Sequence, residues 1–308
     1  MSGAYTHLTI ANDARAHARK TGLRKSTLAA LGTQLKYVEL GAVSPDYPYL
    51  ATDRSQGQWA DAMHLTRTGE LFRCAVQAIH RAPGPSQPKL TAWLFGWASH
   101  VATDMTIHPV IELKVGPYLG NEKAHRICEM HQDAHLFPRM NVGSAALARH
   151  LETGVATCNA PNDADALDPV IEQVWLEALL KTYPAHAAAD APRPSAWHRG
   201  FRRVLSLVAG SNHLFPFARH VGISMGLNYP RFEEIDPQYI RGLKTPEGPM
   251  DLDPLYERAR TNVLEMWRGL DEALVSGRSD ALDALEDWNL DTGRSLATQQ
   301  RVLWSNLA

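Results

Sequence analysis

The sequence has few cysteines, almost no net charge and no long apolar segment. Its three cysteines, Cys74, Cys128 and Cys158, are isolated in a chain of 308 residues, a pattern that excludes a disulfide framework. The formal charge of −2 gives no reason to expect a nucleic-acid-binding protein that depends on bulk electrostatics. No apolar run reaches the ~18 residues that a membrane-spanning helix needs. We therefore expect no transmembrane segment and no nucleic-acid partner.

The first residues also lack a basic stretch followed by a long apolar run, so we expect no secretory signal. The expected compartment is then the cytoplasm, with leaderless export as the alternative. The composition, 44 % hydrophobic and 21 % charged, is that of an ordinary globular protein. A chain of this length can bury a sizeable hydrophobic core.

Helical periodicity dominates the chain and no segment alternates as a strand would, which predicts an all-α fold. Prolines mark several expected helix ends, as in APGPSQP at 82–88, at Pro109 and at Pro138. The expected helices are 56–81, 89–108, 122–137, 142–152, 169–182, 197–209, 254–276 and 279–306.

We expect two halves that pack as one domain. Residues 1–150 would form a metal-binding helical core, and residues 151–308 a helical C-terminal half. Within the second half, the Pro- and Ala-rich residues 183–196 predict a linker or surface excursion. Residues 210–254 are irregular and rich in aromatics. Such a segment often forms a lid or a substrate-binding region, although core packing explains its aromatics equally well.

The stretch FGWASHVATDMTIHP, residues 95–109, places an ionisable side chain at every fourth position: His100, Asp104 and His108. Positions four apart on an α-helix differ by about 40° in direction and about 6 Å in rise, so these side chains form one narrow stripe. Apolar residues such as Trp97 flank it, so the stripe should face the interior. A buried carboxylate without partners costs several kcal/mol. A metal ion would satisfy all three side chains at once.

The same spacing recurs in HRICEMHQD, where His125, Glu129 and Asp133 occupy positions i, i+4 and i+8 of another expected helix. Two helices that each carry a His/carboxylate stripe are typical of metal sites in helical-bundle cores. The alternative is i,i+4 pairing at the surface. Imidazoles and carboxylates without paired thiols favour zinc and also suit manganese or iron.

Three further residues are candidate ligands. Asp46 lies in the rigid turn Pro45-Asp46-Tyr47-Pro48, His64 lies on the expected 56–81 helix, and His7 lies near the start of the chain. Each has a structural alternative. An interior histidine is commonly hydrogen-bonded to a carbonyl, and an aspartate between prolines commonly forms an Asx turn or a helix cap.

The motifs GAVSPDYPYL, FGWASHVATDMTIHP and HRICEMHQD, in this order, resemble the zinc-dependent phospholipase C family. That family includes bacterial phospholipases C and the catalytic part of glycosylphosphatidylinositol-specific phospholipase D, and zinc-dependent single-strand nucleases have the related fold. The resemblance covers roughly residues 1–150. It implies an all-α domain with a metal cluster in a cleft, to which this chain adds C-terminal helices.

The resemblance assigns each metal-ligand position of the family to one residue here. One zinc would be held by Asp46, His64, His100 and Asp104. A second would be held by His108, His125 and Glu129. His7 and Asp104 would contribute to a third, which the free N-terminal amine completes in secreted members. Because six residues precede His7, the expected content is two to three zinc ions.

The implied activity is hydrolysis of a phosphodiester, most simply a phospholipid, with peripheral contact to a membrane. Zinc lowers the pKa of a bound water toward ~7, and Asp46 would orient or deprotonate the attacking water. Three alternatives remain open. A nuclease or nucleotidase would need an aromatic stacking platform and a groove for phosphates. A non-catalytic scaffold would use the metal only for stability, and a redox oxygenase would need iron.

Overall fold

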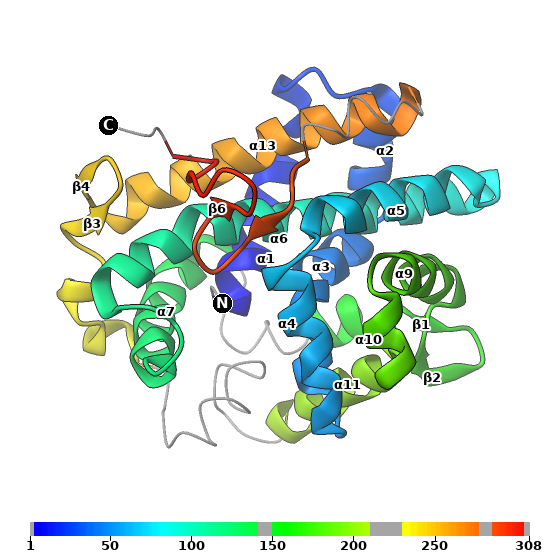
Figure 1. Ribbon diagram of the computed structural model, residues 1–308, viewed down its shortest axis with the longest axis horizontal. Helices are drawn as coiled ribbons and strands as arrows, with labels where there is room; N and C mark the ends of the chain where they lie inside the picture. Colours follow the sequence, from blue (N-terminus) through cyan, green and yellow to red (C-terminus); the bar gives the residue numbers. More distant parts are fainter. Residues whose placement is uncertain (1–2, 141–149, 210–229, 277–284, 305–308) are drawn as a thin grey trace.

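The computed structural model describes residues 3–140, 150–209, 230–276 and 285–304, and these residues form the all-α fold that the periodicity predicts (Figure 1). The α-helices are α1 Ala4–His17, α2 Lys25–Thr33, α3 Leu35–Val43, α4 Gly57–Leu65, α5 Thr68–Arg81, α6 Gln87–Val115, α7 Glu122–Leu136, α9 Pro169–Thr182, α10 Pro184–Ala189, α11 Pro194–Ala209 and α13 Leu252–Ser276. The 3₁₀ helices are η1 Ala18–Lys20, η2 Ser44–Leu50, η3 Arg54–Gln56, η4 Gly84–Ser86, η5 Phe137–Met140, η6 Val155–Thr157, η7 Phe232–Glu234 and η8 Pro237–Tyr239.

The strands of the described residues form short antiparallel pairs and no larger sheet. They are β1 Asn159–Ala160 with β2 Asp163–Leu167, β3 Leu243–Thr245 with β4 Gly248–Met250, and β5 Trp288–Asn289 with β6 Arg294–Ser295. In the second pair Leu243 lies opposite Met250. These pairs are short hairpins within a helical protein.

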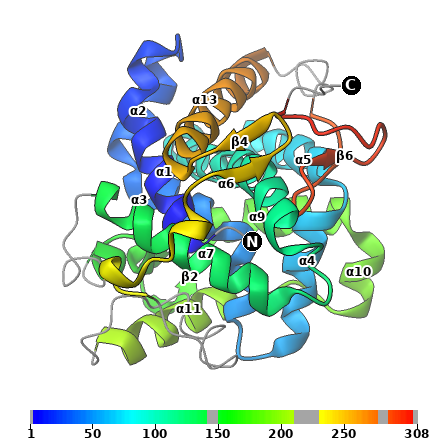
Figure 2. The same ribbon diagram turned by 90° about the vertical axis from the view of Figure 1, so that its left-hand side faces the viewer.

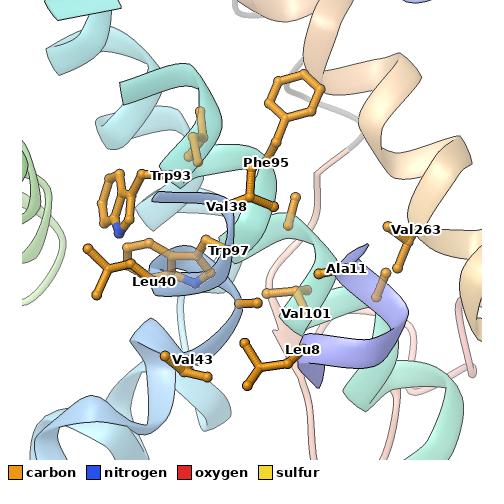
Figure 3. Close-up of a cluster of buried hydrophobic side chains, with 14 of the residues drawn as sticks. Leu8, Ala11, Val38, Leu40, Val43, Trp93, Phe95, Trp97, Val101 and Val263 are labelled. Carbon is orange, nitrogen blue, oxygen red and sulfur yellow. The ribbon is translucent and has the colours of Figure 1, made fainter. Parts of the chain in front are cut away.

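Helix α6 is the centre of the molecule. Every residue from Ala92 to Ile111 is buried, so other elements cover this part of the helix on all sides. Helices α1, α2, α3, α7 and α13 pack against it, and Figure 2 shows α1, α3 and α13 gathered around it. Figure 3 shows side chains of four helices in one cluster: Leu8 and Ala11 of α1, Val38, Leu40 and Val43 of α3, Trp93, Phe95, Trp97 and Val101 of α6, and Val263 of α13.

Helices α3 and α6 approach each other backbone to backbone at two glycines. A Cβ atom added to Gly41 would lie 2.0 Å from the carbonyl oxygen of Trp93, and one added to Gly96 would lie 2.0 Å from that of Val38. No side chain fits at either position. The close approach brings the end of α3 against the middle of α6, where the histidines of α6 begin.

The expected single helix over 56–81 is wrong, because the chain breaks between α4 and α5 at Arg67, whose φ is +51°. Each half has buried residues at helical spacing, and no proline or glycine stands at the break to mark it. Distant groups satisfy the carbonyls freed there: the Tyr183 hydroxyl contacts the carbonyl oxygen of Thr66 at 2.6 Å, and the Leu290 N–H donates to that of His64 at 2.8 Å.

The expected helix end at Pro109 is also wrong, since α6 continues to Val115. A proline inside a helix removes one donor and crowds the carbonyl four residues earlier. Here Val110 and Ile111 beyond it are fully buried, and their burial outweighs that cost. Gly293, from the C-terminal hairpin, packs directly against the carbonyl of Met105 that lacks its usual partner.

Four expected helices are confirmed, as α7, α9, α11 and α13. The expected linker at 183–196 instead contains α10, and the expected helix at 279–306 is wrong over 285–304, where β5 and β6 form a hairpin. Most of the expected 142–152 helix, and residues 210–229 of the 210–254 segment, lie outside the described residues. The rest of that segment, 230–254, consists mainly of η7, η8 and the β3–β4 hairpin and is irregular as expected. The division near residue 150 stays a prediction.

Candidate metal centre

The histidine and aspartate stripe of α6 is buried in the middle of the molecule. His100, Asp104 and His108 are each at most 2 % exposed. Asp104 lies between the two rings, with Oδ2 3.1 Å from Nε2 of His100 and Oδ1 3.0 Å from Nε2 of His108. The four-residue spacing thus produces a continuous row of polar atoms inside an apolar helix.

Other elements bring further side chains to this row. His7 of α1 stacks its ring on His100, with centroids 3.8 Å apart, and its Nε2 lies 3.2 Å from Oδ1 of Asp104. His64 of α4 places Nε2 3.2 Å from Nε2 of His100 and 3.5 Å from Oδ2 of Asp104. Asp46 of the proline-rich η2 places Oδ1 3.4 Å from Nε2 of His64.

The backbone fixes the orientation of two of these rings. Nδ1–H of His64 donates to the carbonyl of Ala60 at 2.8 Å, and Nδ1–H of His100 donates to that of Ala42 at 2.9 Å. A carbonyl only accepts, so in each neutral ring the proton is on Nδ1 and Nε2 keeps its lone pair. The close α3–α6 approach is what brings Ala42 to His100.

The resulting centre consists of acceptors that face one another. When both rings are neutral, two imidazole lone pairs lie 3.2 Å apart, with carboxylate oxygens of Asp46 and Asp104 beside them. Such a set is repulsive unless a positive charge lies between its members. Imidazole and carboxylate ligands whose rings are fixed by second hydrogen bonds are the arrangement that proteins use for zinc. The residues therefore fit a divalent metal.

The described residues form two groups whose ligand atoms lie within 4.8 Å of one another: His7, His100 and Asp104, and Asp46, His64 and His100. His100 belongs to both groups. This is the geometry expected of neighbouring metal ions that are held by overlapping sets of side chains.

The electrostatics of the centre also favour positive charge. Burial alone would raise the pKa of Asp46, but the adjacent His100 and His64 lower it to about 2. Burial alone would lower the pKa of His64, but Asp104 and Asp46 raise it to about 10. Burial raises the pKa of Asp104 too, and His108 and His100 hold it well below the usual range. Both carboxylates are therefore ionised at neutral pH.

His125 and Glu129 of α7 are not in either group. Nε2 of His125 lies 2.6 Å from the carbonyl oxygen of Gly116, and Glu129 pairs with Arg126 at 3.0 Å. The assignment of His108, His125 and Glu129 to one zinc stays a prediction. Asp133, the third member of the α7 stripe, accepts from both N–H and Oγ1 of Thr6 and so anchors the helix that carries His7.

One acidic residue near the centre is not among the ligands that the sequence predicts. Asp291, between β5 and β6, places Oδ1 3.6 Å from Nδ1 of His108. Burial alone would raise its pKa, and the contact with His108 lowers it to about 2. The sequence predicts a helix here, and a helical interpretation does not single out Asp291. The signal in the sequence is the turn-forming run Asn289 to Gly293, in which Gly293 has a φ of +64°.

The comparisons with known proteins give one match. The model of a family described as zinc dependent phospholipase C matches residues 6–184, more than half of the chain, and that range contains all eight expected ligands. No curated protein and no solved structure matches the chain. Among the described helices, none is both long enough and apolar enough to cross a membrane.

Proposed function

The chain belongs to the zinc-dependent phospholipase C family, and we propose on this basis that it is a zinc-dependent hydrolase of phosphodiesters, with a phospholipid as the preferred substrate class. The observation that carries the proposal is that two imidazole Nε2 atoms, of His64 and His100, converge with carboxylate oxygens of Asp46 and Asp104 while backbone carbonyls hold Nδ1 of both rings. In this proposal His7, Asp46, His64, His100 and Asp104 hold zinc around the two groups of converging atoms. His108, His125 and Glu129 hold a further ion as the family's motif order implies.

Zinc bound here would supply hydroxide at neutral pH and neutralise charge on the phosphoryl oxygens. The chain's own contribution to proton transfer is Asp46. Its side chain is 15 % exposed, whereas those of the other members of the two groups are at most 3 % exposed. Asp46 is also ionised at neutral pH. It is therefore the acceptor that a substrate water can reach, which supports a role as general base.

Apolar side chains near α7 support an amphiphilic substrate. Tyr118 packs edge-on against His125 with ring centroids 5.3 Å apart, and the adjacent Leu119 is 88 % exposed. Both lie in the connection between α6 and α7. An exposed leucine beside a half-exposed tyrosine is available for contact with the apolar part of a substrate. This supports a phospholipid over a water-soluble phosphoester.

The first test is the metal content of the purified protein, measured by elemental mass spectrometry. We expect about two to three zinc ions per chain, falling sharply in Asp104→Ala because Asp104 contacts His7, His100 and His108. Glu272→Ala removes an exposed carboxylate of α13 and should retain the wild-type content. A chain that contains no zinc, or iron that is unaffected by Asp104→Ala, would contradict the proposal.

A second test identifies the substrate class. Zinc-loaded protein is given phosphatidylcholine vesicles, a water-soluble nitrophenyl phosphodiester and a single-stranded DNA oligonucleotide. Release of a phosphorylated head group from the vesicles is the expected result. Cleavage of the oligonucleotide alone would favour a nuclease. Bound zinc without hydrolysis of any of the three would favour a scaffold.

A further inference from the structure

His108 differs from His64 and His100 of the proposed centre in what its second nitrogen faces. Nδ1 of His64 and of His100 donates to a backbone carbonyl. Nδ1 of His108 faces a carboxylate instead, with Oδ1 of Asp291 3.6 Å away, while its Nε2 lies 3.0 Å from Asp104. The His108 ring thus lies between two acidic side chains that compete for its proton.

The turn that carries Asp291 is attached to the elements of the centre on both sides. The Leu290 N–H donates to the carbonyl of His64 at 2.8 Å, and Leu290 is fully buried. Gly293 packs against α6, where an added Cβ would lie 2.6 Å from the carbonyl oxygen of Met105. Figure 1 shows this C-terminal hairpin, in red, beside α6 and α4. Asp291 is therefore placed by contacts before and after it.

We propose that Asp291 is a positioning residue of the metal centre: it holds the His108 proton on Nδ1, so that Nε2 is left as a zinc ligand. A carboxylate that accepts from the outer nitrogen of a metal-bound histidine fixes its tautomer and orientation and makes the ring a better ligand. At 3.6 Å the contact is electrostatic and longer than a hydrogen bond.

This inference rests on the proposed function, and it extends the centre beyond the family match. The match ends at residue 184, whereas Asp291 lies more than a hundred residues later. The C-terminal hairpin would then be part of the metal centre as well as part of the packing. The ligand concerned is zinc, and the step concerned is the binding of zinc rather than catalysis.

The experiment measures zinc affinity by competition with a fluorescent zinc chelator, using the full chain. Asp291→Asn keeps the shape of the side chain and removes its charge, and we expect it to weaken one zinc site about 10- to 100-fold. The matched control is Asp287→Asn in the same hairpin, where Asp287 accepts from the Glu70 N–H. The control should retain wild-type affinity, and both variants should bind the full number of zinc ions at saturation.

A second measurement separates positioning of the ring from general damage to the hairpin. In zinc-loaded protein labelled with ¹⁵N histidine, the His108 signals are assigned by their loss in His108→Gln. We expect a protonated Nδ1 in the wild type and in Asp287→Asn, and a shifted or exchange-broadened Nδ1–H signal in Asp291→Asn. The signals of His64 and His100 should not move, because their protons are held by backbone carbonyls.

The outcomes distinguish this inference from the proposed function. Equal zinc affinity and an unchanged His108 signal in Asp291→Asn would overturn the inference alone. Loss of one zinc at saturation would also overturn it, because Asp291 would then be a direct ligand. If the wild type binds no zinc, the proposed function fails and the inference fails with it.

Discussion

Buried and half-buried histidines of this chain have different partners for their ring nitrogens, and the partner determines what each ring can do. His64 and His100 use backbone carbonyls, which fix the tautomer without adding charge. His198 places Nδ1 3.0 Å from the Tyr47 hydroxyl. His150 places Nε2 2.7 Å from the buried carboxylate of Glu39. The first two rings therefore turn Nε2 toward the proposed centre, whereas the outward partner of His150 is a carboxylate that favours its protonated form.

The His150–Glu39 pair leads to a prediction about pH. The hydrogen bond to Glu39 raises the pKa of His150, and partial burial opposes this. A raised pKa in the folded state stabilises the fold below the unfolded value of about 6.5, and this contribution is lost as the pH rises through the folded value. We expect His150→Gln to cost about 1 kcal/mol at pH 6 and progressively less up to pH 9.

Urea denaturation of the two proteins at a series of pH values measures this difference. His80→Gln, a change at an exposed position of α5, serves as the control and should show no such pH dependence. A cost of His150→Gln that grows with pH would contradict the assignment of the charge to His150.

At the scale of elements, the sequence predicts what depends on local pattern. Helices α7, α9 and α13 follow from their periodicity, and the interior position of the α6 stripe follows from its apolar neighbours. The break at Arg67 and the passage of α6 through Pro109 do not follow. Both depend on groups distant in sequence, namely Tyr183 at the break and Gly293 beside Pro109.

The difference between local pattern and contacts distant in sequence also determines which site residues could be predicted. His100 and Asp104 lie on one helix, so their spacing is sufficient. Asp46 and His64 come from motifs with recognisable turn or helix positions, and the order of motifs relates them to the stripe. Asp291 is different, because its position depends on a hairpin that docks on α4 and α6. A helical interpretation of the last residues therefore hides it.

The α3–α6 crossing gives a prediction at the element scale. A methyl group at Gly96 would lie 2.0 Å from the carbonyl oxygen of Val38, so the two helices must separate in Gly96→Ala. Overpacking of this kind costs about 1–3 kcal/mol. It also moves Ala42 away from His100 and frees that ring, so zinc affinity should fall together with stability.

Gly269→Ala on α13 is the matched control, because an added Cβ there has no atom within 4 Å. Alanine is the better helix former, so this variant should be more stable by up to about 1 kcal/mol and should bind zinc normally. Chemical denaturation and the chelator competition assay measure the two properties. Wild-type zinc affinity in a destabilised Gly96→Ala would show that the crossing does not position the His100 ring.

At the scale of the whole molecule, the proposed metal centre joins segments that are far apart in the chain. His7, Asp46, His64 and His100 come from α1, η2, α4 and α6, and only the folded chain brings their atoms within a few ångströms. Zinc that binds the folded state and not the unfolded chain shifts the folding equilibrium by mass action. The centre should therefore act as a cross-link between the N-terminal helices.

Removal of the metal should measurably destabilise the protein for this reason. At free zinc roughly 1,000 times the dissociation constant of one site, the stabilisation is about 4 kcal/mol. For a chain of this size that corresponds to a fall in melting temperature of about 5–10 °C on addition of EDTA. Excess zinc should restore the temperature. Magnesium should not, because it prefers oxygen ligands in octahedral geometry over imidazoles.

The matched variant is Asp104→Ala, which has lost the carboxylate that contacts His7, His100 and His108. It should melt at nearly the same temperature with and without EDTA. A wild-type protein that contains zinc but whose melting temperature does not respond to EDTA would show that the metal is held at a site that folding does not assemble.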